Sequence, residues 1–317
     1  MRRLKIGLLG CGSVGGGFVR LLAANAALVA ARAEAELEVT RILVRDTAKC
    51  RPGVDPAILT SRARDVVENG VDLVVELIGG IDPARDLIRR SLWSGKHVVT
   101  ANKAVLALAG DDLAELAAVH RVRLGFEASV CGAIPIVRVI RDGLAGDRVL
   151  EIEGVVNGTS NWILSRLEEG APFDDALSDA QARGFAEADP SADVDGIDAA
   201  QKIAILARLA FPGRPLRWRR REGIRGVSAD TIREAAARGE TIRHVARCRE
   251  RDGAVEADVG IERLAPDHPL ARVRNEGNGI VLRTEAAGDL TFYGAGAGSF
   301  PTASSVLADV VEIARRK

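Results

Sequence analysis

The sequence has very little lysine and few aromatic residues. Aromatic residues make up 3% of the 317 positions, and only six of the 44 basic residues are lysine, so 38 are arginine. The lysines are Lys5, Lys49, Lys96, Lys103, Lys202 and Lys317. In a chain that uses arginine wherever a generic positive charge is sufficient, each lysine raises the question of what arginine could not do there.

Other features are also missing. The cysteines lie far apart without a C-x-x-C pair, and among the histidines only His244 falls within four residues of a cysteine, Cys248, which argues against a structural zinc site. The N-terminus lacks the features of a signal peptide, and the apolar runs fall short of the ~20 residues of a membrane span. We therefore expect a soluble, cytoplasmic protein that does not bind a membrane.

The charge balance argues against nucleic acid as a partner. The chain has 44 basic and 44 acidic residues and a net charge of zero, which gives no overall attraction for polyanions. One basic run, RPLRWRRR at 214–221, contains a single tryptophan. Proteins that bind single strands interleave several aromatic residues with their cations, so we interpret this run as an exposed loop or solvated face.

Strand and helix patterns alternate through the first part of the chain. Near-continuous apolar strands at 4–9, 37–44, 71–77, 96–100 and 122–126 are separated by helical patterns, the first at 16–30. This alternation predicts an α/β fold with a Rossmann-like, doubly wound parallel sheet. Beyond about residue 135 the pattern changes, which predicts a second, α+β domain. We place the nucleotide-binding domain at 1–135, rejoined by 286–317, and the second domain at 136–285.

The first strand runs into a glycine-rich loop, and a helix follows. Gly10, Gly12 and Gly15 have the G-x-G-x-x-G spacing, with Ser13 and Val14 between the last two. The spacing suits a tight turn, close approach of a pyrophosphate and close helix packing. We favour dinucleotide binding over a purely structural glycine turn because of this strand–loop–helix setting.

The end of the second strand bears on the choice between NADP and NAD. Arg45 precedes Asp46 there, further beyond Gly15 than the usual spacing of about 20 residues, which indicates an insertion. We favour NADP and leave NAD open, since Arg45 fits equally a contact to the 2′-phosphate and a solvated cation. At a later strand end, Thr100 and Lys103 are expected to line the cofactor crevice.

The segment GFAEADPSADVDGIDAAQKIAILARLA at 184–210 is the richest in candidate chemistry. Its acids suit the start of a helix, and Asp195 is the expected N-cap. Asp198 and Lys202 stand four residues apart and so share one face of a largely apolar helix. Such a lysine is either half of a structural ion pair or a proton-transfer group with a tunable pKa. Burial alone does not separate these two interpretations.

Seven segments, taken in order, resemble the homoserine dehydrogenase family. They are GLLGCGSVG near the start, ELIGG at 76–80, VVTANKAVLA at 98–107, EASVCGAIPI at 127–136, NGTSNWIL at 157–164, GFAEADPSADVDGIDAAQKIAILA at 184–207 and YGAGAGSFPTASSVLADV at 293–310. The resemblance implies NAD(P)-dependent interconversion of L-homoserine and L-aspartate 4-semialdehyde, in threonine and methionine biosynthesis. It is weakest over 214–285.

The resemblance also implies roles for individual residues. Lys202 is similar to the family's acid/base lysine, and Asp198 to the residue that orients substrate and lysine. Lys103 resembles the second lysine, between nicotinamide and substrate. Glu187 resembles the carboxylate that binds the substrate's amino group, and Asp193 is expected to line the substrate site with it.

Further positions carry over from the same resemblance. Gly158 and Thr159 are expected at the substrate carboxylate, and Gly298 beside the cofactor. A loop that in some members holds a sodium ion corresponds to Glu127, Val130, Gly132 and Ile134. Cys131 replaces a glycine common in that loop, and it would be strained if the position needs a positive φ. We expect an inert buried thiol there rather than a redox-sensitive one.

The resemblance implies a homodimer and a small-molecule substrate, and it implies that the second domain, 136–285, serves substrate binding, catalysis and dimerisation. The printed sequence ends shortly after its last matching segment, so we expect a short form without the regulatory ACT domain. One alternative is another NAD(P)-dependent amino-acid oxidoreductase, such as an aspartate dehydrogenase-like enzyme, which leaves 184–207 unexplained. Another is a non-catalytic dinucleotide sensor, which would need neither Asp198 nor Lys202.

Overall fold

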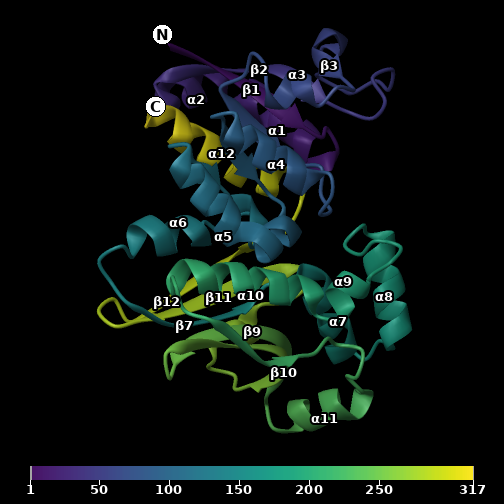
Figure 1. Cartoon of the computed structure of the whole chain (residues 1–317). Helices are drawn as coiled ribbons and strands as arrows, with labels where there is room; N and C mark the ends of the chain where they lie inside the picture. Colours follow the sequence, from purple (N-terminus) through teal and green to yellow (C-terminus); the bar gives the residue numbers. More distant parts are fainter. Residues whose placement is uncertain (1, 317) are drawn as a thin grey trace. The chain divides into compact units, whose positions relative to one another are not determined.

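The computed structural model describes residues 2–316, which divide into two compact units (Figure 1). The first unit contains the residues up to Ala133 together with those from Ala297 onward, and the second is Ile134–Gly296. The sequence placed the return to the first unit at 286. In the structure, residues 286–296 stay with the second unit because strand β12 (Asp289–Ala295) pairs along its length with β11 (Gly277–Thr284).

The first unit is built on a parallel sheet in the order β3-β2-β1-β4-β5-β6. Its strands are β1 (Arg2–Leu9), β2 (Ala35–Leu43), β3 (Leu59–Thr60), β4 (Leu73–Glu76), β5 (His97–Thr100) and β6 (Leu124–Gly125). This is the strand order of the dinucleotide-binding doubly wound fold, so the predicted Rossmann-like architecture is confirmed.

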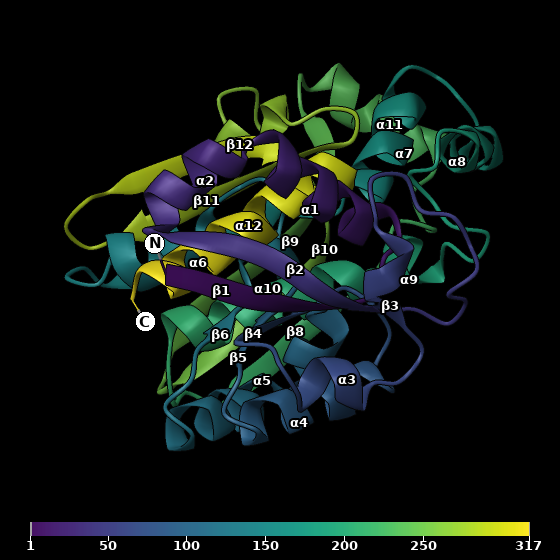
Figure 2. The ribbon, with the colours of Figure 1, turned by 90° about the horizontal axis from the view of Figure 1, so that it is seen from above.

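Helices cover both faces of this sheet (Figure 2). One face packs against α1 (Ser13–Ala24), α2 (Ala26–Ala33) and α12 (Ser299–Arg315), and the other against α3 (Arg64–Val67), α4 (Ala84–Trp93) and α5 (Lys103–Val119). The single helix expected at 16–30 is instead two helices, with a break at Asn25. The second of them accounts for the insertion between the glycine loop and Arg45.

The second unit contains a mixed sheet in the order β12-β11-β7-β9-β10-β8. Its other strands are β7 (Val149–Val155), β8 (Leu216–Arg221), β9 (Thr241–Arg251) and β10 (Ala254–Leu264). Its helices are α6 (Ile136–Arg138), α7 (Gly158–Glu168), α8 (Phe173–Ala182), α9 (Ser191–Val194), α10 (Ile197–Ala210) and α11 (Ala229–Ala237). The basic run at 214–221, expected as an exposed loop or a solvated face, is largely strand β8, in which exposed and partly buried residues alternate.

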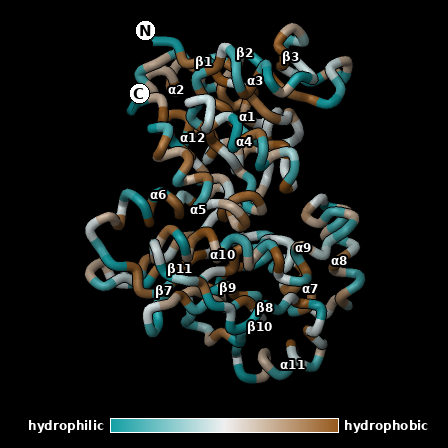
Figure 3. Tube along the Cα trace, viewed as in Figure 1, coloured by the Kyte–Doolittle hydropathy of each residue, from teal (hydrophilic) through white to brown (hydrophobic). Residues whose placement is uncertain are grey.

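The two faces of the second sheet differ in character. Along β9, Ala246 and Cys248 are fully buried, whereas Arg247 and Arg249 are partly exposed, as the alternation of a strand covered on one face requires. Figure 3 shows the corresponding mixture of hydrophobic and hydrophilic residues along the trace. Within residues 2–316, no single helix is long and apolar enough to cross a membrane; the pair α1 and α2 reaches that length and apolarity only jointly, and it bends by 85° at its break.

Candidate functional site

The glycine-rich loop has the geometry that its spacing predicts. Gly10 has a φ of +94°, and a Cβ on Gly15 would lie 2.4 Å from the carbonyl oxygen of Gly10. A Cβ on Gly12 would meet nothing within 4 Å. Gly10 and Gly15 are thus needed for the turn and its packing, whereas Gly12 faces open space. Helix α1 begins at Ser13 without a side-chain cap, so this end suits a bound pyrophosphate.

A buried carboxylate, Glu76, organises the ends of β4 and β5. It accepts hydrogen bonds from the backbone N–H of Ile78 at 2.8 Å and from the Thr100 hydroxyl at 2.6 Å. Thr100 Oγ1 in turn accepts from the N–H of Asn102, whose side chain caps α5 directly before Lys103. Sequence reasoning expected Thr100 and Lys103 at this edge but missed Glu76. An acid that ends an otherwise apolar strand was the available signal.

A hollow of about 450 Å³ lies beside the glycine loop. Gly12 and Ser13 line it, together with Ser299, whose hydroxyl donates to the carbonyl of Ser13 at 2.6 Å. Gly298, expected beside the cofactor, has a φ of +126° and directly precedes Ser299 as the N-cap of α12. Arg45, the expected contact to a 2′-phosphate, is exposed and is not among the residues that line the hollow.

The candidate sodium loop is tightly packed. Glu127 is buried and its backbone N–H donates to Asp309 Oδ2 at 2.8 Å, while the carbonyl of Gly132 accepts from Ser305 at 2.6 Å. Cys131 is buried with a φ of +53°, so cysteine does occupy a conformation that favours glycine. Val130 is also fully buried, whereas Ile134 belongs to the second unit. Among residues 2–316, no group of three or more His, Cys, Asp or Glu side chains is arranged to hold a metal.

In the second unit, Lys202 and Asp198 form a buried ion pair. Lys202 Nζ lies 2.7 Å from Asp198 Oδ2 and donates to the carbonyl oxygen of Val156, also at 2.7 Å. The two side chains are 10% and 4% exposed. The four-residue spacing on α10 places both groups on one face, as predicted, and the residue directly after β7 supplies the carbonyl. Nζ is therefore held in one position by contacts from two elements.

Asn157 joins this pair to a second carboxylate. Its Nδ2 donates to Asp193 Oδ1 and to Asp198 Oδ2, both at 2.7 Å, and its Oδ1 accepts from the N–H of Ser160 to cap α7. Burial raises the pKa of Asp193, and the charge of Asp198 adds to this, against the Asn157 hydrogen bond. Sequence reasoning quoted Asn157 in the NGT motif without giving it a role.

The remaining expected substrate residues are distributed unevenly. The Thr159 hydroxyl donates to the carbonyl of Phe185 at 2.7 Å, and a Cβ on Gly158 would lie 2.7 Å from the carbonyl of Glu276. Glu187 is exposed on the loop before α9, and its side chain makes no hydrogen bond or ion pair with other residues of the 2–316 segment. The structure thus brings Asp193, Asp198 and Lys202 together but leaves Glu187 outside their contacts.

The turn before α10 corrects one expectation. Asp195 is not the N-cap; that position is taken by Gly196, with a φ of +79°. The carboxylate of Asp195 instead accepts from Arg225 Nε at 2.5 Å. A Cβ on Gly196 would meet the carbonyl of Glu222 at 2.7 Å, and this same carbonyl lies 2.8 Å from Nε2 of the buried His244. Burial lowers the pKa of His244.

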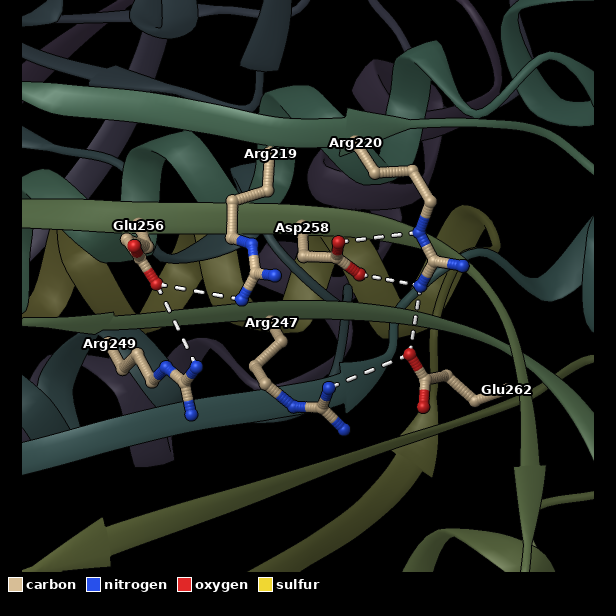
Figure 4. A pocket seen from close by; sticks show the side chains of 7 residues that line it. All are labelled: Arg219, Arg220, Arg247, Arg249, Glu256, Asp258 and Glu262. Atoms are coloured by element: carbon tan, nitrogen blue, oxygen red, sulfur yellow. Dashed lines mark hydrogen bonds and ion pairs between the residues drawn. The ribbon is translucent and has the colours of Figure 1, made fainter.

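A second hollow, of about 420 Å³, lies on the charged face of the second sheet (Figure 4). Arg220 pairs with Asp258 at 2.7 Å and with Glu262 at 2.8 Å, and these acids raise its pKa. Arg219 lies 3.8 Å from Glu256. The basic run therefore meets acidic partners on the neighbouring strand, so these arginines do not form a patch of one sign.

Comparison with known proteins gives matches along the whole chain. Residues 10–127 match the family described as "Homoserine dehydrogenase, NAD binding domain", and residues 135–311 match "Homoserine dehydrogenase". Two relatives named homoserine dehydrogenase are 42% identical, in Pseudomonas aeruginosa, and 46% identical, in Corynebacterium glutamicum. The matches cover 99% and 98% of this chain and 73% and 72% of those relatives.

Solved structures agree with these sequence matches. The crystal structure of a homoserine dehydrogenase from Thiobacillus denitrificans is 40% identical with a TM-score of 0.95, over 99% of this chain and 74% of that one. A hyperthermophilic archaeal homoserine dehydrogenase in complex with NADPH is 30% identical with a TM-score of 0.86. The match covers 99% of this chain and 98% of that one. The chain therefore belongs to the homoserine dehydrogenase family, whose members are NAD(P)-dependent oxidoreductases acting on a CH–OH group.

Proposed function

We propose that this chain interconverts L-homoserine and L-aspartate 4-semialdehyde with a nicotinamide dinucleotide. The observation that carries the proposal is the buried Lys202–Asp198 pair, with Nζ fixed between Asp198 Oδ2 and the carbonyl of Val156. Family membership supports the same substrates, and it disfavours both an aspartate dehydrogenase-like enzyme and a non-catalytic sensor.

The first unit fits a dinucleotide cofactor. Gly12 leaves open space at an uncapped helix N-terminus, where Gly10, Ser13, Val14 and Gly15 would hold the pyrophosphate. Thr100, Lys103 and Gly298 are proposed to contact the cofactor as well. When bound, the nicotinamide supplies or accepts the hydride at the carbon of the reacting carbonyl or alcohol.

The second unit supplies the proton transfer in this proposal. In the reductive direction Lys202 Nζ donates a proton to the oxygen that becomes the hydroxyl, and in the oxidative direction it accepts that proton, a role worth roughly 10²–10⁴-fold in rate. Arginine does not release its proton near neutral pH, so lysine is required. Asp198 orients Nζ, and Asp193, Glu187, Gly158 and Thr159 contribute to substrate binding.

The direct test is an absorbance assay of cofactor reduction. Purified protein is incubated with L-homoserine and NADP or NAD over a broad alkaline range, with L-aspartate as the alternative substrate. Reduction with homoserine and not with aspartate is expected. Absence of homoserine-dependent reduction with either cofactor would contradict the proposal, and reduction with aspartate alone would favour the aspartate dehydrogenase-like alternative.

Three finer features are part of the proposal. We favour NADP over NAD, a homodimer, and a sodium ion held by backbone carbonyls of the loop at 127–134; oxygen ligands suit such a hard cation. The support for NADP is the basic character of the segment after β2, and the support for the other two is family resemblance. Light scattering of the purified protein tests the dimer, and sodium-dependent thermal stabilisation, compared with lithium, tests the ion.

A further inference from the structure

The loop that follows β4 is held by the side chain of Glu76. Its Oε1 accepts hydrogen bonds from the backbone N–H groups of Ile78 at 2.8 Å and of Gly79 at 3.3 Å. Within residues 2–316 these two N–H groups make no other hydrogen bond, and Ile78 and Gly79 are both exposed. Glu76 itself is fully buried. The exposed part of the loop is therefore fixed mainly by hydrogen bonds to a buried group and not by packing of its own side chains.

The same side chain is linked to the start of α5. Glu76 Oε2 accepts from the Thr100 hydroxyl at 2.6 Å, and Thr100 Oγ1 accepts from the N–H of Asn102 at 3.0 Å. The Asn102 side chain then serves two elements. Its Oδ1 caps α5 by accepting from the N–H of Val105, and its Nδ2 donates to the carbonyl of Gly80 at 2.7 Å. These hydrogen bonds form a closed ring that runs from Glu76 through the end of β5 and back to the loop after β4.

The negative charge of Glu76 has no cationic partner. No arginine, lysine or histidine nitrogen of residues 2–316 lies within 4.0 Å of its carboxylate. A buried carboxylate costs free energy that only its hydrogen bonds offset, whereas an apolar side chain would fill the same strand position without that cost. Stability of the sheet therefore does not account for an acid at this position.

The neighbours of the ring place it beside the expected cofactor site. A Cβ on Gly10 would lie 2.8 Å from the carbonyl oxygen of Leu77, so the glycine turn packs directly against the residue after Glu76. Lys103 is the first residue of α5 and directly follows Asn102. Ligands of doubly wound sheets lie outside the carboxyl ends of the strands, and β1, β4 and β5 all end here. The ring therefore connects the pyrophosphate turn to the helix start that carries Lys103.

We propose that Glu76 is a positioning residue for the nicotinamide half of the cofactor. It acts through Ile78 and Gly79 on the loop after β4, and through Thr100 and Asn102 on the first turn of α5. Hydride transfer requires reacting atoms about 3–3.5 Å apart and aligned, so an edge that is ordered before the cofactor binds favours the reaction. The inference rests on the proposed use of a nicotinamide dinucleotide with Lys103 beside the nicotinamide.

The first test uses the chain without cofactor. Glu76→Ala removes the acceptor of the Ile78 and Gly79 N–H groups, so their amide hydrogen exchange should become roughly tenfold faster or more. The matched control is Ser91→Ala, which removes a buried hydroxyl of α4 in the same unit and should leave both exchange rates unchanged. Unchanged exchange at Ile78 and Gly79 in Glu76→Ala would overturn the proposal.

The second test separates the nicotinamide from the rest of the cofactor. Asn102→Ser keeps a cap for α5 but is too short to reach Gly80, so it opens the ring without uncapping the helix. In this variant and in Glu76→Ala, kcat with homoserine is expected to fall by about 10- to 100-fold. By calorimetry the Kd of NADPH should rise about tenfold, while the Kd of 2′-phospho-ADP-ribose, which lacks the nicotinamide, should not change. A loss of folded protein alone would alter the binding stoichiometry and not these dissociation constants.

Glu76→Gln tests whether contacts or charge are responsible. The amide keeps the shape of the side chain and can still bond to the loop and to Thr100, so kcat should be roughly tenfold or more above that of Glu76→Ala. Equal damage in the two variants, or equal weakening of both ligands, would overturn the positioning role. If the wild type binds NADPH without oxidising homoserine while the variants still lose affinity for NADPH alone, the proposed function fails and this role stands. Wild-type homoserine oxidation in both Glu76→Ala and Asn102→Ser would do the reverse.

Discussion

The acid–lysine cluster of the second unit and the basic hollow of the first handle charge in opposite ways. Lys202, Asp198 and Asp193 are held to one another through direct contact or through Asn157, at 2.7 Å in each case. Arg20, Lys49 and Arg51, which line the hollow beside the glycine loop, have no carboxylate within 4.0 Å in the described part of the chain. In the function that we propose, the group that transfers a proton is preorganised by the chain, whereas the cations of the hollow are left for an anionic ligand to neutralise.

The largest expected effect is at Lys202. Lys202→Arg keeps the charge beside Asp198 but removes the transferable proton, so kcat should fall by roughly 10²–10⁴-fold while cofactor binding persists. Stopped-flow measurement of reduced cofactor gives the rate, and cofactor fluorescence gives binding. Since Lys202→Ala would leave Asp198 buried without its cation, the double variant Lys202→Met/Asp198→Asn serves as the folded control. A near-normal kcat in Lys202→Arg would show that Lys202 does not transfer the proton and that the ion pair has only a structural role.

Loss of the Asn157 side chain tests how far the cluster depends on its bridging amide. Asn157→Ala removes two donors to carboxylates and the cap of α7, so the free energy of unfolding should fall by about 3 kcal/mol. The matched control is Ser228→Ala, which removes only the exposed cap of α11 and should cost about 1 kcal/mol. Urea unfolding measures both. Equal losses would show that the carboxylates do not need the amide.

The free energy of unfolding lost in Asn157→Ala should depend on pH in a defined direction. The folded-state pKa of Asp193 is already raised by burial, and removal of the Asn157 donor raises it further. A carboxyl whose folded pKa is raised binds its proton more tightly when folded, so its contribution to stability decreases as pH rises through that pKa. The deficit of Asn157→Ala should therefore be smaller at pH 5 than at pH 7.

The sequence predicted the doubly wound sheet because its buried parallel strands are continuous apolar runs. It also placed Asp198 and Lys202 on one helix face, since helical spacing is a local property. It did not predict that Gly196 would take the N-cap from Asp195, because that depends on Glu222, which is distant in sequence and leaves no room for a Cβ. The strand at β8 was likewise missed, because Glu256 and Asp258, the acids that pair with Arg219 and Arg220, lie on β10, which is distant in sequence.

The positions of Arg45 and Arg51 show the same limit of sequence-based prediction. Both are basic residues after the second strand, and their sequence neighbourhoods do not rank them. Only the folded chain shows that Lys49 and Arg51 line the hollow beside the glycine loop while Arg45 does not. Which cation faces a ligand is set by the path of the loop after β2, and local patterns carry little information about such paths.

A smaller effect is expected at His244, which lies beneath the turn that precedes α10. Its folded-state pKa is lowered by burial, so folding releases its proton whenever the unfolded chain would carry one. Stability should then fall as pH drops below the unfolded pKa of about 6.5, by at most about 1.4 kcal/mol per pH unit. His244→Gln, which keeps an N–H for Glu222 but does not titrate, should have the shallower slope between pH 7 and pH 5. Parallel slopes in chemical unfolding would contradict this.

The smallest effect separates the two regions by their response to salt. The cations of the hollow are solvent-accessible, so raising ionic strength from about 0.05 M to about 0.5 M should screen them and raise the KM for NADP several-fold. The KM for NAD should change less, and kcat at saturating cofactor should hardly change, because Lys202 and Asp198 are buried. Arg51→Ala should flatten the NADP response. If the KM for NADP and the KM for NAD rise equally with salt, the hollow does not discriminate between the two cofactors. The cations of the first unit would then not differ in function from other exposed charges.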